Sequence, residues 1–165
     1  MPLSPLGVFH TIIGIGAVLA VICLLWQDKH IDVTRPLAKL YLVATVLTAG
    51  SALGIFRHGG ANPAHGLAVL TILAVVFGVI AAKTNMLGGY QRYFVALCFS
   101  STVLFHLIPT ATEILTRFPA SEPLVSSLKD PLLLKTYLVI LVVFVIGFAL
   151  QLKWLHQQPA GSKQA

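Results

Sequence analysis

The chain has 165 residues, of which 57% are hydrophobic and 10% are charged, and its mean hydropathy is +0.89. Soluble domains carry about 25% charged residues, so this composition excludes an ordinary soluble protein and indicates the lipid bilayer as its solvent. The net charge of +6 is spread over the ends of apolar runs rather than gathered in a basic tract, so we expect no nucleic-acid partner. The length allows several spans of about 20 residues and predicts a single transmembrane domain over 1–165.

Five apolar runs, each long enough to cross a bilayer, follow one another along the sequence. We predict an all-α integral membrane bundle with five transmembrane helices, at about residues 6–26, 36–56, 63–82, 89–108 and 131–154. The pairs Asn62-Pro63 and Asp130-Pro131 each combine an N-cap side chain with a proline at the first helical position, which is typical of a helix start. Five spans would place the two termini on opposite sides of the membrane.

Small residues predict how these helices pack. Gly14 and Ala17 share a face of the first helix, and Gly50 and Gly54 form a G-x-x-x-G pattern on the second. Such residues let membrane helices approach closely, so we expect the first four helices to form the core. Residues 138–146 of the last helix are almost free of small or polar side chains, which predicts a peripheral fifth helix that faces lipid or a second copy in a homo-oligomer.

The distribution of Lys and Arg predicts the orientation, because cationic loops are retained in the cytoplasm. One side collects seven cationic residues: Lys29, Arg35, Lys39, Lys83, Arg92, Lys153 and Lys163. The other side has four: Arg57, Arg117, Lys129 and Lys135. The aromatic residues expected at the interface of the first side are Trp26, Tyr41, Tyr90, Tyr93 and Trp154. We therefore predict a bacterial inner (plasma) membrane protein with its N-terminus outside and its C-terminus in the cytoplasm.

Four of the six histidines fall in one layer near the outer ends of the predicted helices. His10 lies just over one turn into the first helix, His58 follows the second, His65 is in the first turn of the third, and His106 is in the last turn of the fourth. At a rise of about 1.5 Å per residue, His10 and His106 lie roughly 5 Å below the outer boundary. This shared depth predicts a histidine-lined pocket at the outer face.

Helical periodicity predicts that His10 and His106 both point into the bundle. His10 shares a face with Gly14 and Ala17, on the side where we expect the first helix to pack. His106 shares a partly polar face with Thr102. Ionisable groups at membrane depth usually face the bundle interior and mark functional sites. The alternative is that both are interior histidines hydrogen-bonded to Ser, Thr or backbone carbonyl groups.

Other polar groups near the predicted pocket have simpler interpretations. His58 lies beside a cation and two glycines, which is typical of a solvated loop. The sequence Thr110-Ala-Thr-Glu113 has the pattern of a capping box, although Glu113 is the only carboxylate close to the histidines and is therefore a candidate ligand or base. His30 and His156 lie in polar segments on the cytoplasmic side, and we expect both to be solvated surface residues.

Two segments are expected to cover the predicted pocket. Residues 56–66 form a short polar turn between two apolar runs and would make the rim, with Arg57–Asn62 as a lid. The segment Thr110–Asp130 is long for a simple connection and contains two prolines. We expect it to form an amphipathic turn or short helix over the same opening.

Convergent histidines suggest three kinds of chemistry. One is a haem b with two axial histidines, His10 with His65 or His106, for electron transfer. A second is a copper, zinc or iron site to which His58 and Glu113 also contribute; either site would serve redox chemistry with a quinone or another redox membrane protein. The alternative is a small transporter or structural membrane subunit whose histidines bind protons or substrate without a metal. The sequence names no reaction, so whether the protein is an enzyme stays open.

Two short segments carry a resemblance to known proteins. The sequence His10-Thr-Ile-Ile-Gly14 and the entry to the second helix at Arg35-Pro-Leu-Ala-Lys-Leu-Tyr41 resemble the opening part of small, uncharacterised bacterial multi-pass inner-membrane proteins. The layout of histidines on several membrane helices also resembles cytochrome b561-type proteins, which implies haem-mediated electron transfer. All inner histidines lie in a single layer, whereas a two-haem protein of that type needs a second pair near the other face, so the resemblance implies one haem.

Overall fold

The structure is a computed structural model that describes residues 4–56, 60, 62–84 and 86–159. Throughout these residues the regular structure is helical, without strands. The α-helices are α1 (Pro5–Asp28), α2 (Pro36–Ala52), α3 (Pro63–Lys83), α4 (Gln91–Arg117) and α5 (Pro131–Gln157). A short 3-10 helix, η1 (Gly88–Tyr90), leads into α4. The predicted all-helical bundle is therefore confirmed.

Four of the helices are long and apolar enough to cross a membrane: α1, α3, α5, and α4 together with η1. The remaining helix, α2, is apolar but has 17 residues. It ends at Ala52 and not at Phe56 as predicted, because the chain turns where Gly54 donates its backbone N–H to Ser51 and Ile55 donates to Ala52. Glycine is a poor helix former, so the helix stops just before it.

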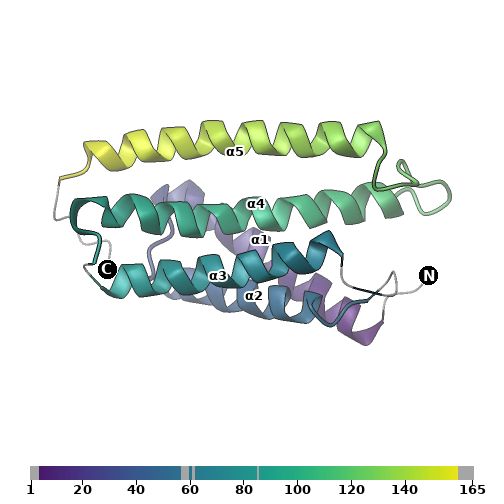
Figure 1. The fold of residues 1–165 in the computed structure, drawn as a ribbon, viewed down its shortest axis with the longest axis horizontal. Coiled ribbons are helices and arrows are strands. Elements are labelled where there is room, and N and C mark those ends of the chain that lie inside the picture. Colours follow the sequence, from purple (N-terminus) through teal and green to yellow (C-terminus); the bar gives the residue numbers. More distant parts are fainter. Residues whose placement is uncertain (1–3, 57–59, 61, 85, 160–165) are drawn as a thin grey trace.

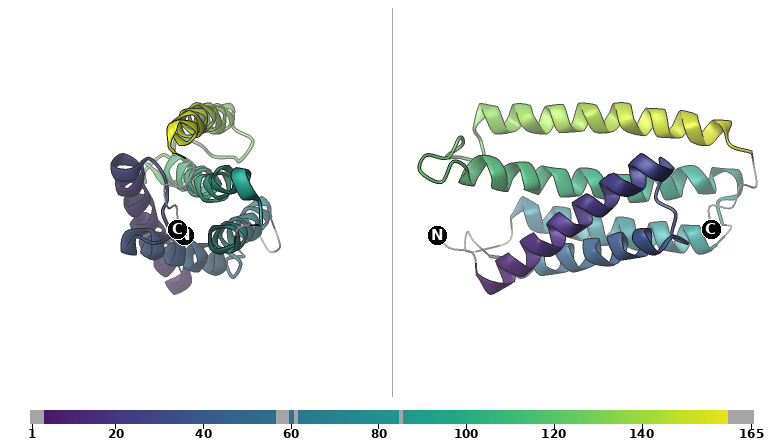
Figure 2. Two further views of the ribbon diagram at one scale, coloured as in Figure 1. Left: turned by 90° about the vertical axis from the view of Figure 1, so that its left-hand side faces the viewer. Right: turned by 180° about the vertical axis from the view of Figure 1, so that it is seen from behind.

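The helices pack largely in chain order, as Figures 1 and 2 show. The neighbouring pairs α1–α2, α2–α3, α3–α4 and α4–α5 are in contact, whereas α1 and α4 touch only slightly. The end-on view in Figure 2 shows α5 outside the group formed by α1 to α4, resting on α4. We call the end of the bundle where α1 begins the His10 end, and the opposite end the His30 end.

Capping side chains fix the helix starts that the sequence predicted. Asn62 accepts a hydrogen bond from the backbone of Ala64 and begins α3, and Asp130 does the same for Leu132 in α5. In each helix the first residue is a proline, which has no N–H to leave unpaired. Ser4 caps α1 in the same way.

Small residues allow close contacts between neighbouring helices. A Cβ atom at Gly14 would lie 3.4 Å from the Thr48 side chain, and Ala17 is fully buried, so α1 packs on α2 through the predicted face. Gly78 of α3 lies against α4. Of the G-x-x-x-G pair, Gly50 faces open space, whereas Gly54, just beyond the end of α2, lies close to α1, because a Cβ atom there would be 3.0 Å from the Leu6 side chain.

The fourth helix is longer than predicted. It continues through Pro109 to Arg117 instead of ending at residue 108. The hydroxyl groups of Thr110 and Thr112 each donate to the carbonyl oxygen four residues earlier, inside the helix. The predicted capping box at Thr110-Ala-Thr-Glu113 is therefore wrong, because these residues lie within a helix and not at the start of one.

The segment after α4 forms no helix. Residues 118–130 fold back against the last turns of α4, where Val125 is buried and donates its backbone N–H to Leu115. The loop is visible beyond the ends of α4 and α5 in Figure 1. The expectation of a short helix in this segment is therefore wrong.

Candidate functional site

Inside the group formed by α1 to α4, polar and apolar side chains occupy different halves. The half toward the His10 end holds most of the buried polar side chains of α2, α3 and α4: Thr45, Thr48, Thr71, Thr102 and His106. The half toward the His30 end holds apolar side chains of all four helices, among them Val21, Leu24, Val75, Val95 and Phe99. We call these regions the polar half and the apolar half.

His10 of α1 is held by the last turn of α2. Its Nδ1 atom lies 3.0 Å from the carbonyl oxygen of Thr48 and 3.1 Å from the hydroxyl of Ser51, which itself donates to the same carbonyl at 2.9 Å. A carbonyl oxygen can only accept and the Ser51 proton is already used, so Nδ1 must donate to both. The proton of the neutral ring therefore sits on Nδ1, and Nε2 is the nitrogen that can take up another proton.

His106 of α4 reaches the same helix one turn further along. It is 7% exposed, and its Nε2 atom lies 3.1 Å from the Thr45 hydroxyl. Thr45 is fully buried on α2, three residues before Thr48. The predictions that His10 and His106 point inward are confirmed, and α2 carries the hydroxyl and carbonyl groups that hold both rings.

Tyr41 is a member of the site that the sequence reasoning placed elsewhere. Predicted as an interface residue, it is fully buried on α2, and its hydroxyl lies 2.6 Å from the Thr102 hydroxyl of α4. Thr102 in turn donates to the carbonyl oxygen of Phe99 at 2.6 Å, so Tyr41 must be the donor to Thr102. The signal was present in the sequence, because Tyr41, Thr45 and Thr48 are spaced as one face of a helix.

Thr48 leaves one polar atom unpaired in the middle of the site. The residue is 6% exposed, and its hydroxyl has no hydrogen-bond partner within the described parts of the chain. A buried hydroxyl without a partner costs about 1–3 kcal/mol. It lies on the α2 face that also holds His10 and His106, so the site offers a hydrogen-bonding group that its own side chains do not use.

His65 contributes to the cap of its own helix, α3. Its Nδ1 atom accepts the backbone N–H of Asn62 at 3.3 Å, which completes the cap of α3, and its ring packs 4.8 Å from the ring of Phe56. The neighbouring His58 lies outside the described residues, as does part of the predicted lid. His65 is therefore a capping residue at the His10 end.

Glu113 lies one helix turn before the end of α4. It is exposed on the extended end of α4 and forms an ion pair with Arg117, one turn later. Among the described residues, no group of three or more His, Cys, Asp or Glu side chains is placed to hold a metal ion. The structure thus brings His10 and His106 to one helix face, places His65 in the cap of α3 with its buried Nε2 atom unpaired within the described residues, and places Glu113 in an ion pair with Arg117.

The donor set at this face does not fit a three- or four-ligand metal site. The imidazoles of His10 and His106 are accompanied by neutral hydroxyl and carbonyl groups, whereas copper, zinc and iron sites use several imidazole, thiolate or carboxylate ligands. A haem between His10 and His106 would need both imidazoles as axial ligands, and the Nε2 atom of His106 is already bonded to Thr45. The arrangement instead consists of separate hydrogen bonds that join each imidazole to hydroxyl or carbonyl groups of α2.

A second polar cluster joins the helices at the His30 end. The Gln151 side chain of α5 accepts a hydrogen bond from Ser100 of α4 at 2.7 Å and donates to the carbonyl oxygen of Lys29 at 2.8 Å. The ring of His30 stacks on Trp154 at 5.3 Å. His30 is therefore a packed residue, contrary to the predicted solvated one, whereas His156 is exposed as predicted.

Comparison with known proteins returns no matching family model, curated protein or solved structure.

Proposed function

We propose that this is a five-span protein of a bacterial inner membrane, with its N-terminus outside, in which the polar half handles protons for a small transporter. The observation that carries the proposal is that His10 and His106, from two different helices, are both held by one polar face of α2. Ionisable residues at membrane depth mark proton or ion pathways. Imidazole is the side chain best suited to accept and release protons near neutral pH.

The polar face of α2 extends over about half of the thickness of a membrane. At about 1.5 Å per residue, the stretch from Tyr41 to Ser51 covers about 15 Å, which is half of a hydrocarbon core of about 30 Å. Hydroxyl groups can donate and accept at the same time, so Thr45 and Ser51 can relay a proton that reaches either histidine. The site therefore extends from the His10 end to the middle of the membrane.

The placement of charged and aromatic residues supports the proposed orientation. Lys29 and Arg35 flank the connection between α1 and α2 at the His30 end, where Trp26 and Tyr90 are highly exposed, as expected of interface anchors. The helix α2, with 17 residues, is about 26 Å long. A slightly short helix is accommodated by local thinning of the bilayer at modest cost, so α2 can serve as the fifth span.

The apolar face of α5 supports a lipid or protein contact. Most of its large apolar side chains are exposed, and few residues of its apolar stretch are buried. In the proposed arrangement α5 faces the lipid bilayer or α5 of a second copy in a homo-oligomer.

Proton flux into vesicles tests the proposal. Purified protein is reconstituted into liposomes that contain a pH-sensitive dye, and a potassium diffusion potential drives protons inward. We expect slow acidification above that of protein-free vesicles, reduced by His10→Gln and by His106→Gln. His156→Gln, which changes an exposed histidine, is the matched control and should leave the flux unchanged. Flux equal to that of protein-free vesicles, or unaffected by both site variants, would contradict the proposal.

The haem and metal hypothesis is tested separately on the same material. Haem b or a transition metal bound through Nε2 of His106 would require that ring to leave Thr45, and would serve electron transfer with a quinone or a redox protein. An absorption spectrum with a Soret band, or stoichiometric copper, zinc or iron that is lost in His106→Gln, would favour that function over proton handling.

A further inference from the structure

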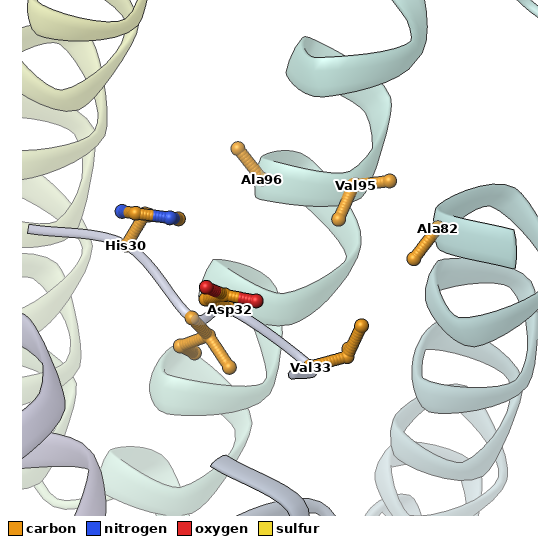
Figure 3. Close-up of a pocket in the computed structure, with 7 residues that line it drawn as sticks. His30, Asp32, Val33, Ala82, Val95 and Ala96 are labelled. Atoms are coloured by element: carbon orange, nitrogen blue, oxygen red, sulfur yellow. The ribbon is translucent and has the colours of Figure 1, made fainter. Parts of the chain in front are cut away.

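A small cavity lies at the His30 end, beyond the apolar half from the histidine site. Its wall combines His30 and Asp32 of the α1–α2 connection with Ala82 of α3 and with Val95 and Ala96 of α4. Figure 3 shows the connection crossing α4, with the His30 ring on the side of α5. The cavity therefore opens where the four-helix group meets the proposed cytoplasmic side.

The cavity wall carries an imidazole and a carboxylate, those of His30 and Asp32. The Nδ1 atom of His30 lies 2.8 Å from the carbonyl oxygen of Asp28, so Nδ1 carries the proton and Nε2 is the basic nitrogen. The carboxylate of Asp32 accepts the backbone N–H and the hydroxyl of Thr34, both through Oδ1 at 2.8 Å. An imidazole and a carboxylate are the side chains most often used for proton transfer.

One face of α4 runs from this cavity to the histidine site. Val95, Phe99, Thr102 and His106 follow one another at spacings of four, three and four residues, which places them on the same side of the helix. All four are buried. The rise from Val95 to His106 is about 16 Å, so the cavity and the site lie at the two ends of this face, with Phe99 between them.

The Phe99 side chain fills the space between the cavity and the histidine site. Its side chain is 1% exposed, and a Cβ atom at Gly78 would lie 2.5 and 2.8 Å from two atoms of its ring. The ring thus fills the room that a side chain at position 78 would take. The hydrogen bonds from Tyr41 through Thr102 also end here, at the Phe99 carbonyl oxygen, so the chain of donors stops at an apolar layer.

We propose that the cavity beside His30 and Asp32 is the second access chamber for protons, and that Phe99, seated on Gly78, is the barrier between this chamber and the histidine site. The inference rests on the proposed function and adds to it a defined entry and a gate. Protons exchange with the histidine site from the His10 end, and they reach the chamber only when the Phe99 ring moves off Gly78.

Sided cysteine labelling tests the barrier without relying on proton flux. Cys23 and Cys98 are free cysteines and are first replaced by serine. Thr102→Cys then reports on the histidine side of Phe99, and Ala96→Cys reports on the chamber. A charged, membrane-impermeant thiol reagent is added to the His30 side or to the His10 side of vesicles with known orientation.

The barrier is removed by Phe99→Ala, and Phe99→Leu is the milder replacement. Phe94→Ala, at a partly exposed position on the same helix, is the control.

We expect the reagent, added to the His30 side, to modify Ala96→Cys even when Phe99 is present. From the same side it should modify Thr102→Cys several-fold faster when Phe99 is replaced by Ala or Leu than when Phe99 is present. The same variants should raise the histidine-dependent proton flux. An unreactive Ala96→Cys would overturn the chamber. Equal rates at Thr102→Cys in Phe99→Ala and Phe94→Ala would overturn the barrier. If wild-type vesicles show no histidine-dependent flux, the proposed function is wrong, whereas the labelling rates still decide whether Phe99 is a barrier.

Discussion

The two halves of the bundle interior are built from the same four helices but with opposite chemistry. Toward the His10 end, α2 presents Thr45, Thr48 and Ser51 to histidines from α1 and α4. Toward the His30 end, the same helices meet through apolar side chains such as Leu24 and Phe99, both almost fully buried. A bilayer provides no hydrophobic drive for helix association. The helices are therefore held together by hydrogen bonds in the polar half and by close packing in the apolar half.

The difference separates packing from function. The apolar half depends on shape, since Gly78 lets the Phe99 ring approach α3 directly. The polar half depends on hydrogen bonds, and it tolerates an unpaired buried hydroxyl at Thr48 that a purely structural contact would not need. The polar half therefore holds the proposed proton-binding groups, and the apolar half holds the proposed barrier.

The largest effect should come from disturbing the close contact in the apolar half. Gly78→Ala would place a methyl group within 3.0 Å of Phe99 and Cys98, and overpacking of this kind costs about 1–3 kcal/mol. The free energy of unfolding in mixed micelles should fall accordingly. Gly50→Ala, which meets open space, is the control, and equal losses in both variants would mean that α3 and α4 do not touch as described.

A smaller loss is expected at the His10 end, outside the site. His65→Ala removes the side chain that accepts the Asn62 N–H in the cap of α3, and lost caps cost about 1 kcal/mol. Stability should decrease while histidine-dependent proton flux remains. If His65→Ala abolishes flux as His106→Gln does, His65 belongs to the polar site after all.

Hydrogen bonds within the polar half should each contribute less to stability. Thr45→Val keeps the shape of the side chain but removes the partner of His106, and hydrogen bonds between membrane helices average about 0.6 kcal/mol. A double-mutant cycle with His106→Gln measures the coupling between the two side chains. Thr136→Val, whose hydroxyl bonds only within α5, serves as the control, and a coupling of zero would argue against the described contact.

The smallest effect is expected at the boundary between the halves. Tyr41→Phe removes the donor to Thr102 but leaves Thr102 bonded to the Phe99 carbonyl oxygen. The loss of stability should stay below that of Thr45→Val. If a water-soluble quencher reaches the Tyr41 ring of the wild-type protein, Tyr41 lies at the membrane interface, where the sequence had placed it.

The helical membrane class and the two inward histidines could be predicted from the sequence, because hydropathy and helical periodicity depend only on residues that are close together in the chain. The depth of His10 and His106 followed from counting residues along each helix, and their inward direction from Gly14 and Thr102. Tyr41 was misplaced because an aromatic residue near a helix end fits both an interface anchor and a core position. Only the contact with Thr102, which lies on another helix, separates the two.

Features that depend on partners far along the chain escaped prediction. Pro109 looked like the end of a helix, but hydroxyl groups beyond it continue to bond within α4. His30 looked solvated because its neighbours in sequence are polar, whereas its contact with Trp154 joins residues from opposite ends of the chain.

Water access to the two halves is the most direct test of this account. Water-edited solid-state NMR of the protein in bilayers measures how fast magnetisation passes from water to each side chain. The account predicts fast transfer to His10, Ser51 and Thr48 in the polar half and slow transfer to Leu24 and Phe99 in the apolar half. Equal transfer rates in the two halves, or slow transfer to His10 and Thr48, would contradict it.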